Sequence, residues 1–324
     1  MHSSPSNTEM SREPTAREKN FNFRKPTTAA DRVQLGEGTT FLPGKKDPSI
    51  QPLIDHVLEY GYVILPKIYT QEQVDTANAE IARLEALQAG PASTAGRNFF
   101  EGFKTGRVYA LADKSRAFDC FPTHPTVTAL NDYFLQPNPL LSSFHTVVIY
   151  AGQTAQPIHT DDGLVALSRP RPLIGAGTMV SLDDFTADNG ATTVIPKSHL
   201  WSDERLPTRE EMIPAIMPAG SMVYFLNTLW HSGGANTTDK PRRSIAIQYC
   251  QPWARPFENM TIAMGWEDLD KVPEPMLKLM GFSMHDFMGY ADGRSPRAVV
   301  EMRKQRLIEW DMKKKKEKQA SAKL

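Results

Sequence analysis

The sequence has few cysteines and lacks long apolar runs. Only Cys120 and Cys250 occur among 324 residues, and no CxxC spacing is present. This excludes a disulfide framework and a cysteine-based zinc site, and it is typical of a reducing compartment. No apolar stretch approaches the ~18 residues that a membrane-spanning helix needs. We therefore expect no membrane span.

An excess of charge of one sign is also missing. Lys+Arg and Asp+Glu number 37 each, so the formal net charge is zero. No general positive field would attract nucleic acid, and we expect no nucleic-acid partner. The first residues are polar and include proline, without the apolar centre of a secretory signal.

Composition indicates one large domain with extensions at both ends. Hydrophobic residues make up 40% of the chain, which is enough to build a core. Residues 1–46 are rich in Ser, Pro, Thr, Arg and Lys, and we expect an irregular N-terminal segment there. Residues 47–295 are predicted to form the domain with flanking helices. Residues 296–324 are predicted to form a charged helix and tail.

The apolar pattern predicts helices first and strands later. Thr70 and Gln73 form a capping-box pattern at the start of an amphipathic helix. Its apolar positions recur at helical spacing: Val74, Ala77, Ile81 and Leu84. The other early elements are a helix over 50–58 ended by Gly61, a strand over 62–65 and a helix over 126–135.

Short β-branched strands follow, separated by turns rich in Gly, Pro, Asn and Asp. They are predicted over residues 144–150, 178–182, 221–226 and 244–249. After Pro256 the pattern returns to helix and loop. This arrangement indicates a mainly β fold with helical decoration, built as a sandwich or jelly roll.

Three residues in these strand-rich regions suggest a metal site. His159 and Asp161 stand two positions apart and point to one side of an extended segment, whereas Asp162 faces the other side. His231, brought back by the fold, would complete the two-histidine, one-carboxylate set that holds Fe(II). Each piece alone also fits a blander structure: a polar loop for His159 and Asp161, and a structural histidine for His231.

Two adjacent arginines open the strand that follows. Neighbouring residues of a strand face opposite ways, so one of Arg242 and Arg243 points inward. A buried guanidinium needs an anionic partner, and the 5-carboxylate of 2-oxoglutarate would supply one. The alternative is a solvated pair at a sheet edge.

In combination these motifs resemble the phytanoyl-CoA dioxygenase family of Fe(II)/2-oxoglutarate oxygenases. The resemblance runs from about residue 62 to 256 and rests on the order and spacing of several pieces. These pieces are residues 103–109, 156–161, 188–199, 231–242 and 292–296.

The resemblance implies a double-stranded β-helix, a cupin-like jelly roll, and assigns the site. It implies His159, Asp161 and His231 as catalytic iron ligands. It also implies four contacts of the co-substrate: Arg242 on the 5-carboxylate, Gln156, Thr192 and, near co-substrate or substrate, Arg107. Lys197 departs from the glycine that the family often has in a Pro-Gly-Ser-His turn, which puts the geometry of that loop in question. His199 in the same turn is interpreted as structural.

The expected function follows from this resemblance. Fe(II), 2-oxoglutarate and O2 would together oxidise, and by default hydroxylate, a small lipophilic substrate. That substrate is a secondary-metabolite intermediate or a fatty acyl thioester, with specificity from residues 163–175 and the C-terminal segment. Asp161 argues against halogenation, since halogenating relatives have a small residue there. A catalytically silent jelly-roll binding protein and a cupin-like isomerase are the alternatives, and a homodimer stays open.

The last three residues suggest a location. Ala322-Lys323-Leu324 is similar to the Ser-Lys-Leu peroxisomal address and follows a lysine run, so the protein is expected to be peroxisomal or cytoplasmic. A fluorescent protein fused ahead of residues 313–324 should enter peroxisomes of a eukaryotic host through the import receptor. A diffuse cytosolic signal, unchanged by deletion of Leu324, would contradict this.

Overall fold

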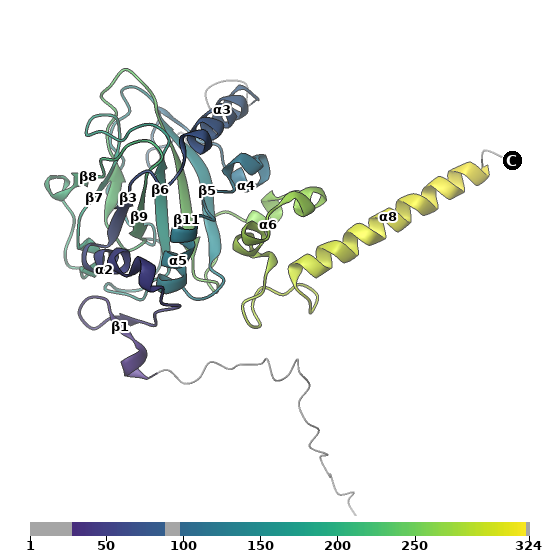
Figure 1. Cartoon of the computed structure of the whole chain (residues 1–324), viewed down its shortest axis with the longest axis horizontal. Helices are drawn as coiled ribbons and strands as arrows, with labels where there is room; N and C mark the ends of the chain where they lie inside the picture. The colour runs from purple at the N-terminus through teal and green to yellow at the C-terminus, as the bar shows by residue number, and fades with distance from the viewer. Residues whose placement is uncertain (1–27, 88–97, 322–324) are drawn as a thin grey trace, which may run out of the picture.

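Two antiparallel sheets form the centre of the computed structural model, which describes residues 28–87 and 98–321 (Figure 1). The larger sheet contains β3 (Tyr62–Leu65), β4 (Thr105–Gly106), β5 (Leu140–Ile149), β6 (Gly175–Ser181), β9 (Met222–Leu226) and β11 (Arg242–Cys250). The smaller contains β7 (Thr192–Val194), β8 (Ile213–Pro214) and β10 (His231–Gly233). Their orders are β3-β9-β6-β11-β5-β4 and β10-β7-β8. The predicted mainly β jelly roll is confirmed.

The predicted helices are also confirmed. They are α2 (Gln51–Tyr60), α3 (Gln71–Leu87), α5 (Pro125–Phe134) and α8 (Pro296–Ser321), with short helices α4 (Leu111–Lys114), α6 (Met260–Ala263) and α7 (Glu274–Leu277) between them. At the start of α3, Gln73 N donates to Thr70 Oγ1 at 3.2 Å and Thr70 N donates to Gln73 Oε1 at 2.9 Å. This is the reciprocal capping box that the sequence predicts. The buried residues of α3 are Val74, Ala77, Ile81 and Leu84.

The two faces of the larger sheet have different surroundings. Along β11, Ile245, Ile247 and Tyr249 join the main core with residues of α2, α3 and α5. The alternate residues Arg242, Ala246 and Gln248 face the other way and line a cavity. Strand alternation therefore separates a helix-covered, stabilising face from a face that is free to carry chemistry.

Gly61 joins α2 to β3 at a point where no side chain fits. Its φ is +85°, in the left-handed region, and its N–H donates to Val57 O at 2.8 Å. A Cβ at this position would lie 2.5 Å from His199 Nδ1 and 2.6 Å from Leu229 Cδ1. The glycine thus ends the helix and lets the smaller sheet's loops approach it closely.

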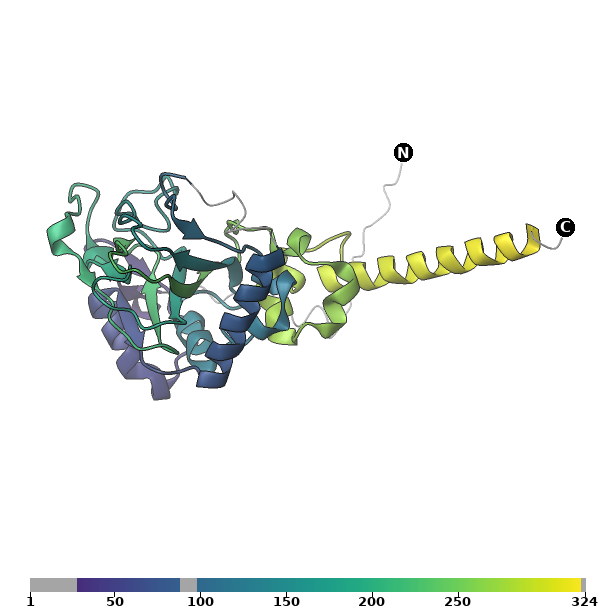
Figure 2. The same ribbon diagram turned by 90° about the horizontal axis from the view of Figure 1, so that it is seen from above.

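The two ends of the described chain join the domain in different ways. Residues 28–46, predicted to be irregular, contain a short hairpin of β1 (Val33–Gln34) and β2 (Thr40–Phe41). Leu35 and Phe41 are buried in the main core, which holds the hairpin in place. At the other end α8 projects from the body (Figure 2). Residues 322–324, which carry the expected peroxisomal address, lie outside the described residues.

Within the described residues no helix combines the length and the apolar character needed to cross a bilayer.

Gly61→Ala should lower the free energy of unfolding by about 2–4 kcal/mol, because backbone strain adds to overpacking against His199 and Leu229. Urea denaturation would measure the loss. Gly38→Ala is the matched control. It has φ +70° but nothing within 4 Å of the added Cβ, so only the strain of about 1 kcal/mol applies. Equal losses in the two variants would contradict the packing argument.

Candidate active site

A cavity of about 600 Å³ lies between the two sheets. Its walls come from β5, β6, β9 and β11 of the larger sheet, from β7 and β10 of the smaller, and from the segments 100–109 and 156–164. Most of its lining is apolar, including Phe100, Val147, Met179, Phe225 and Phe257. The polar side chains among the lining residues are therefore the ones to explain.

His159 and His231 are held opposite each other by their backbones. His159 N donates to His231 O at 3.0 Å, and His231 N donates to His159 O at 2.9 Å. This reciprocal pairing extends the smaller sheet by one bridge beyond β10. The centroids of the two imidazole rings lie 4.3 Å apart. The fold has brought together two segments that are distant in sequence.

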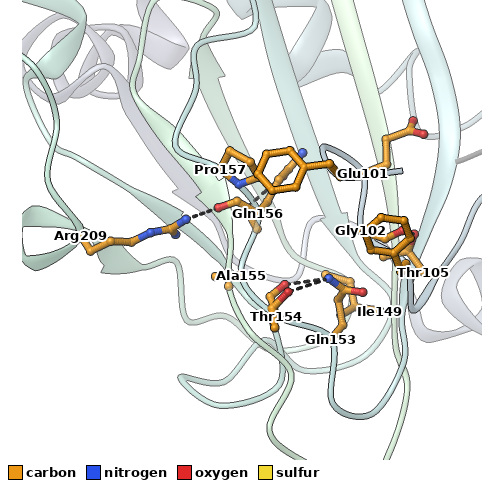
Figure 3. Close-up of a pocket in the computed structure, with 14 residues that line it drawn as sticks. Glu101, Gly102, Thr105, Ile149, Gln153, Thr154, Ala155, Gln156, Pro157 and Arg209 are labelled. Carbon is orange, nitrogen blue, oxygen red and sulfur yellow. Dashed lines mark hydrogen bonds between the residues drawn. The ribbon is translucent and has the colours of Figure 1, made fainter. Parts of the chain in front are cut away.

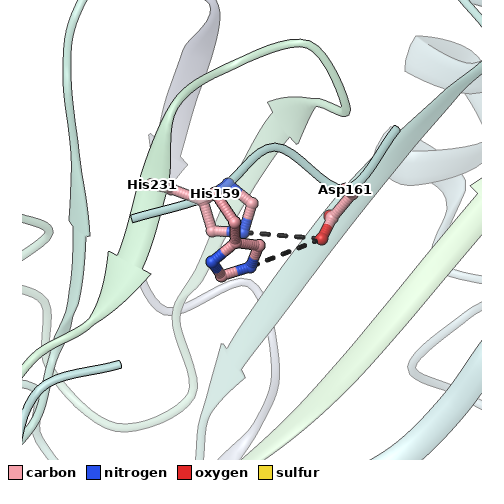
Figure 4. Close-up of side chains that lie close together, drawn as sticks. All are labelled: His159, Asp161 and His231. Carbon is pink, nitrogen blue, oxygen red and sulfur yellow. Dashed lines mark ion pairs between the residues drawn. The ribbon is translucent and has the colours of Figure 1, made fainter. Parts of the chain in front are cut away.

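Each imidazole is oriented by a backbone carbonyl. His159 Nδ1 lies 2.9 Å from Pro157 O, and His231 Nδ1 lies 3.0 Å from Leu229 O. A carbonyl oxygen can only accept, so both Nδ1 atoms donate and both Nε2 atoms carry a lone pair when the rings are neutral. These Nε2 atoms point toward Asp161 Oδ1, at 3.8 Å and 3.5 Å (Figure 4).

The electrostatics of this trio favour a cation between its members. Burial lowers the pKa of both His159 and His231 to about 4 and raises that of Asp161 to about 6. At neutral pH the imidazoles are uncharged, so the contacts drawn in Figure 4 are not ion pairs. Three lone-pair donors converge within 4.8 Å with no proton between them, and Asp161 Oδ2 is buried without a partner. Such a donor set fits a divalent iron ion.

Asp162 is turned away from this trio, as the sequence predicts, although residues 161–164 form a turn rather than an extended segment. It accepts two hydrogen bonds from Arg171, at 2.9 Å and 2.8 Å, and both side chains are buried. Arg171 also donates to Val165 O and Leu167 O. The pair connects the turn after Asp161 to the segment that leads into β6 and so supports the segment that carries Asp161. Sequence reasoning placed Asp162 outside the site but did not find its partner.

Arg242 is the inward-facing member of the arginine pair, and Arg243 the outward one. Arg242 is 2% exposed; its Nη atoms donate to Ser244 Oγ and Gly190 O at 2.5 Å, and its Nε is buried without a partner. Burial lowers its pKa to about 9, so it stays charged at neutral pH. Arg243 instead lies 3.5 Å from Asp183 at the surface. A buried guanidinium without a carboxylate partner needs an anion from outside the chain.

Gln156 and Thr192 also line the cavity. Gln156 Oε1 accepts from Gly233 N at 3.2 Å, and Thr192 is buried in β7, whose register pairs it with Gly233. The two predicted co-substrate residues therefore flank one glycine of β10. They lie on the same wall as His231.

A smaller cavity of about 270 Å³ adjoins the first and shares Gln156 with it (Figure 3). The backbone carbonyl of Gln156 accepts from Arg209 Nη2 and from Ser232 Oγ at 2.6 Å, while Arg209 Nη1 donates to Ser232 Oγ at 3.1 Å. Arg209 thereby fixes the chain three residues before His159. No local pattern in the sequence predicts this support.

Arg107 lies in the cavity wall, and sequence reasoning missed its partners. Its Nη1 lies 2.9 Å from His145 Nε2, and His145 Nδ1 lies 2.8 Å from Ser143 Oγ. The available signal was Ser143 and His145, two polar residues at alternate positions on the strand face that also carries Val147 and Ile149.

The turn containing Lys197 keeps the backbone that a glycine would adopt. Lys197 has φ +66°, and its Nζ lies 3.0 Å from Glu59 Oε1 and 4.9 Å from the Tyr60 ring centroid. The lysine therefore leaves the loop geometry intact. His199, 2% exposed, donates from Nε2 to Leu58 O at 3.1 Å and packs against Gly61, which fits its structural interpretation.

A jelly roll with this ligand set and a buried, unpaired arginine defines a metal-dependent dioxygenase. The chain belongs to the phytanoyl-CoA dioxygenase (PhyH) family, whose model matches residues 57–244. The dioxygenase trt7 of Aspergillus terreus is 30% identical over 199 residues, covering 58% of this chain and 69% of trt7. The dioxygenase FUM3 of Gibberella moniliformis is 28% identical over 247 residues, covering 71% and 82%.

A solved structure shares the fold. The epimerase SnoN, crystallised with Fe3+, alpha ketoglutarate and nogalamycin RO, superposes with a TM-score of 0.53 at 23% identity. The match covers 65% of this chain and 88% of SnoN. The expected family and the expected enzyme class are confirmed.

The pH dependence of stability should report the structural role of His199. Burial lowers its pKa from 6.5 to about 4, so as pH falls through this window the unfolded chain gains a proton that the folded protein does not. The free energy of unfolding should fall toward pH 4, with on the order of 3 kcal/mol from His199. His199→Gln, which keeps a donor for Leu58 O, should show a shallower slope in urea titrations. An unchanged slope would contradict the assignment.

Proposed function

We propose that the protein is an Fe(II)/2-oxoglutarate-dependent dioxygenase that hydroxylates a C–H bond of a small lipophilic molecule. The observation that carries this is the convergence of His159, Asp161 and His231 in the cavity, together with the unpaired charge of Arg242. Iron with 2-oxoglutarate and O2 would supply the oxidising chemistry. The chain supplies binding sites, orientation and a largely apolar enclosure.

His159, Asp161 and His231 would hold the iron. The carbonyls of Pro157 and Leu229 fix the tautomer of each histidine, so no ring has to turn or lose a proton before binding. The three ligands come from one side of the cavity, which leaves positions free for the co-substrate. Retention of Asp161 as a carboxylate leaves no gap for a halide.

Arg242 would bind the 5-carboxylate of 2-oxoglutarate. Its two Nη atoms are already fixed by Ser244 and Gly190, so the guanidinium is held rigid and Nε remains to be satisfied. Gln156 and Thr192 would contact the co-substrate from the opposite wall. Arg107 also lines the cavity and would lie near co-substrate or substrate; its Nε has no hydrogen bond, but Glu101 Oε1 lies 3.8 Å away.

A catalytically silent binding protein would not require this arrangement. It would have no reason to keep three lone-pair donors and an unpaired arginine buried in one cavity, because each is destabilising when empty. The direct test is mass spectrometry of succinate and product with a panel of acyl-CoAs and of terpenoid and polyketide intermediates. Hydroxylation adds one oxygen atom to the product. Absence of iron-dependent succinate formation with every substrate would contradict the proposal.

His231→Ala should abolish iron retention and lower turnover at least about 100-fold, since even residues behind a ligand affect metal sites by 10- to 100-fold. The fold should persist, because the backbone of His231, not its ring, pairs with His159. Metal analysis after gel filtration and succinate release would measure both effects. His199→Gln, which removes a buried histidine outside the trio, should retain iron. Full activity of His231→Ala would show that His231 does not hold the iron.

Arg242→Ala should weaken 2-oxoglutarate binding by about 2–5 kcal/mol, the range for loss of one partner of a buried charge pair. Arg243→Ala, on the same strand but facing Asp183 at the surface, should change it little. The KM for 2-oxoglutarate and calorimetric titration of the metal-loaded protein would compare the two. A larger effect from Arg243 would mean that the inward and outward faces are assigned wrongly.

A further inference from the structure

One polar cluster in the cavity is not used by the metal or by Arg242. On the cavity face of β5 the residues run Ile149, Val147, His145 and Ser143, and the register of β11 places Arg242 opposite Ile149 and Gln248 opposite Ser143. Ser143 thus lies at the end of the wall away from the co-substrate arginine. Gln248 also lines the cavity and lies near the Asp161 carboxylate, so this end is beside the residues that would hold the metal. It is the place where a substrate would approach the metal.

The hydrogen bonds of this cluster can run in only one direction. Arginine has donors but no acceptor, so the contact of 2.9 Å from Arg107 Nη1 makes His145 Nε2 the acceptor. The proton of the neutral ring is then on Nδ1, which donates to Ser143 Oγ at 2.8 Å. Burial and the charge of Arg107 lower the pKa of His145 to about 3, in agreement with a neutral ring.

This direction leaves the hydroxyl proton of Ser143 available. Ser143 Oγ already accepts from His145 and cannot also donate to it. No acceptor for the proton is found within the described part of the chain, although Ser143 is only 7% exposed and lines the cavity. A buried hydroxyl that faces a cavity with an unused proton needs an acceptor from a ligand.

The charges around the cluster are already balanced. Glu101 Oε1 lies 3.8 Å from Arg107 Nε and accepts from the Tyr109 hydroxyl at 2.5 Å. With iron and 2-oxoglutarate bound, the two positive charges of Fe(II) would balance the two negative charges of 2-oxoglutarate. Arg107 and Arg242 would balance Asp161 and Glu101. A further buried charge on the substrate would have no partner.

We propose that Ser143 donates a hydrogen bond to an uncharged acceptor oxygen, such as a ketone or ester carbonyl, of the lipophilic substrate, with Arg107 and His145 as positioning residues. The inference rests on the proposed function for the place of the metal and co-substrate. It favours an oxygenated neutral molecule over a coenzyme A thioester. Apart from the two arginines, the lining residues that the structure describes include no cationic side chain that could bind phosphates. The lining residues at the exposed edge of the cavity include the apolar side chains Phe100, Leu164 and Phe257.

The first experiment tests the direction of the relay without any substrate. In the full chain labelled with 15N-histidine, two-bond 1H–15N spectra identify the tautomer of each ring, and His145→Gln assigns the signal of His145. We expect a neutral ring with the proton on Nδ1 between pH 5.5 and 8. A proton on Nε2 alone would overturn the proposal, because Nδ1 would then be an acceptor to which Ser143 could donate. A charged ring would also overturn it, because Arg107 Nη1 could not donate to a protonated Nε2.

The second experiment tests the substrate group by binding rather than turnover. Matched triplets of several alicyclic skeletons, each as ketone, parent hydrocarbon and carboxylate, are equilibrated with anaerobic protein loaded with Fe(II) and 2-oxoglutarate. Affinity-selection mass spectrometry quantifies retention. Wild type should bind at least one ketone more tightly than the matching hydrocarbon and carboxylate. Ser143→Ala should weaken the binding of that ketone roughly three- to tenfold. Ser143→Thr, which keeps the hydroxyl, should restore it.

Thr146→Val is the matched control for these variants. It removes a hydroxyl of the same strand that faces the other side of the sheet and accepts from Val108 N. It should leave the preference for the ketone unchanged. A panel in which no ketone is preferred, or a preference that survives in Ser143→Ala, would overturn the proposal. Failure of the proposed function would appear separately, as absence of iron or 2-oxoglutarate binding in the same samples before any ketone is added.

Discussion

The site depends on the reciprocal backbone hydrogen bonds between His159 and His231. They fix the register of two segments that are 72 positions apart in the chain. Residues paired in this way extend their side chains from the same face, so both imidazoles meet the carboxylate of Asp161. A shift of one residue would turn a ring out of the cavity, because side chains alternate along a strand. The neighbouring carbonyls of Pro157 and Leu229 then complete the orientation.

The cavity concentrates groups that a stable core would avoid. Asp161 Oδ2 and the Nε atoms of Arg107 and Arg242 are all buried without hydrogen-bond partners. Such groups are destabilising, and they persist where the surrounding structure is strong enough to hold them. Here the opposite face of the larger sheet joins α2, α3, α5 and the shorter helices in one continuous apolar core. A metal ion and a dianion that satisfy these groups would also stabilise the folded chain.

The longer elements could be predicted because each has a strong local pattern. The apolar spacing of α3, its capping box and Gly61 at the end of α2 all depend on neighbours within a few residues. The short strands β7, β8 and β10 have only two or three residues each, which is too few for a periodic signal. The hairpin of residues 33–41 was missed for the same reason. Its stability comes from Leu35 and Phe41 in a core built by distant segments.

The sequence by itself determined the residue types of the site: two histidines, an aspartate and an arginine at spacings typical of one family. It also predicted that Asp161 and Asp162 face opposite ways and that Arg242 and Arg243 do the same, and the family resemblance selected Arg242 as the inward one. Only the tertiary structure decided the partners. It paired Asp162 with Arg171, directed Arg209 to the carbonyl of Gln156 and connected Arg107 through His145 to Ser143. These contacts join residues on different segments, and no local pattern encodes which distant side chain will satisfy a buried polar group.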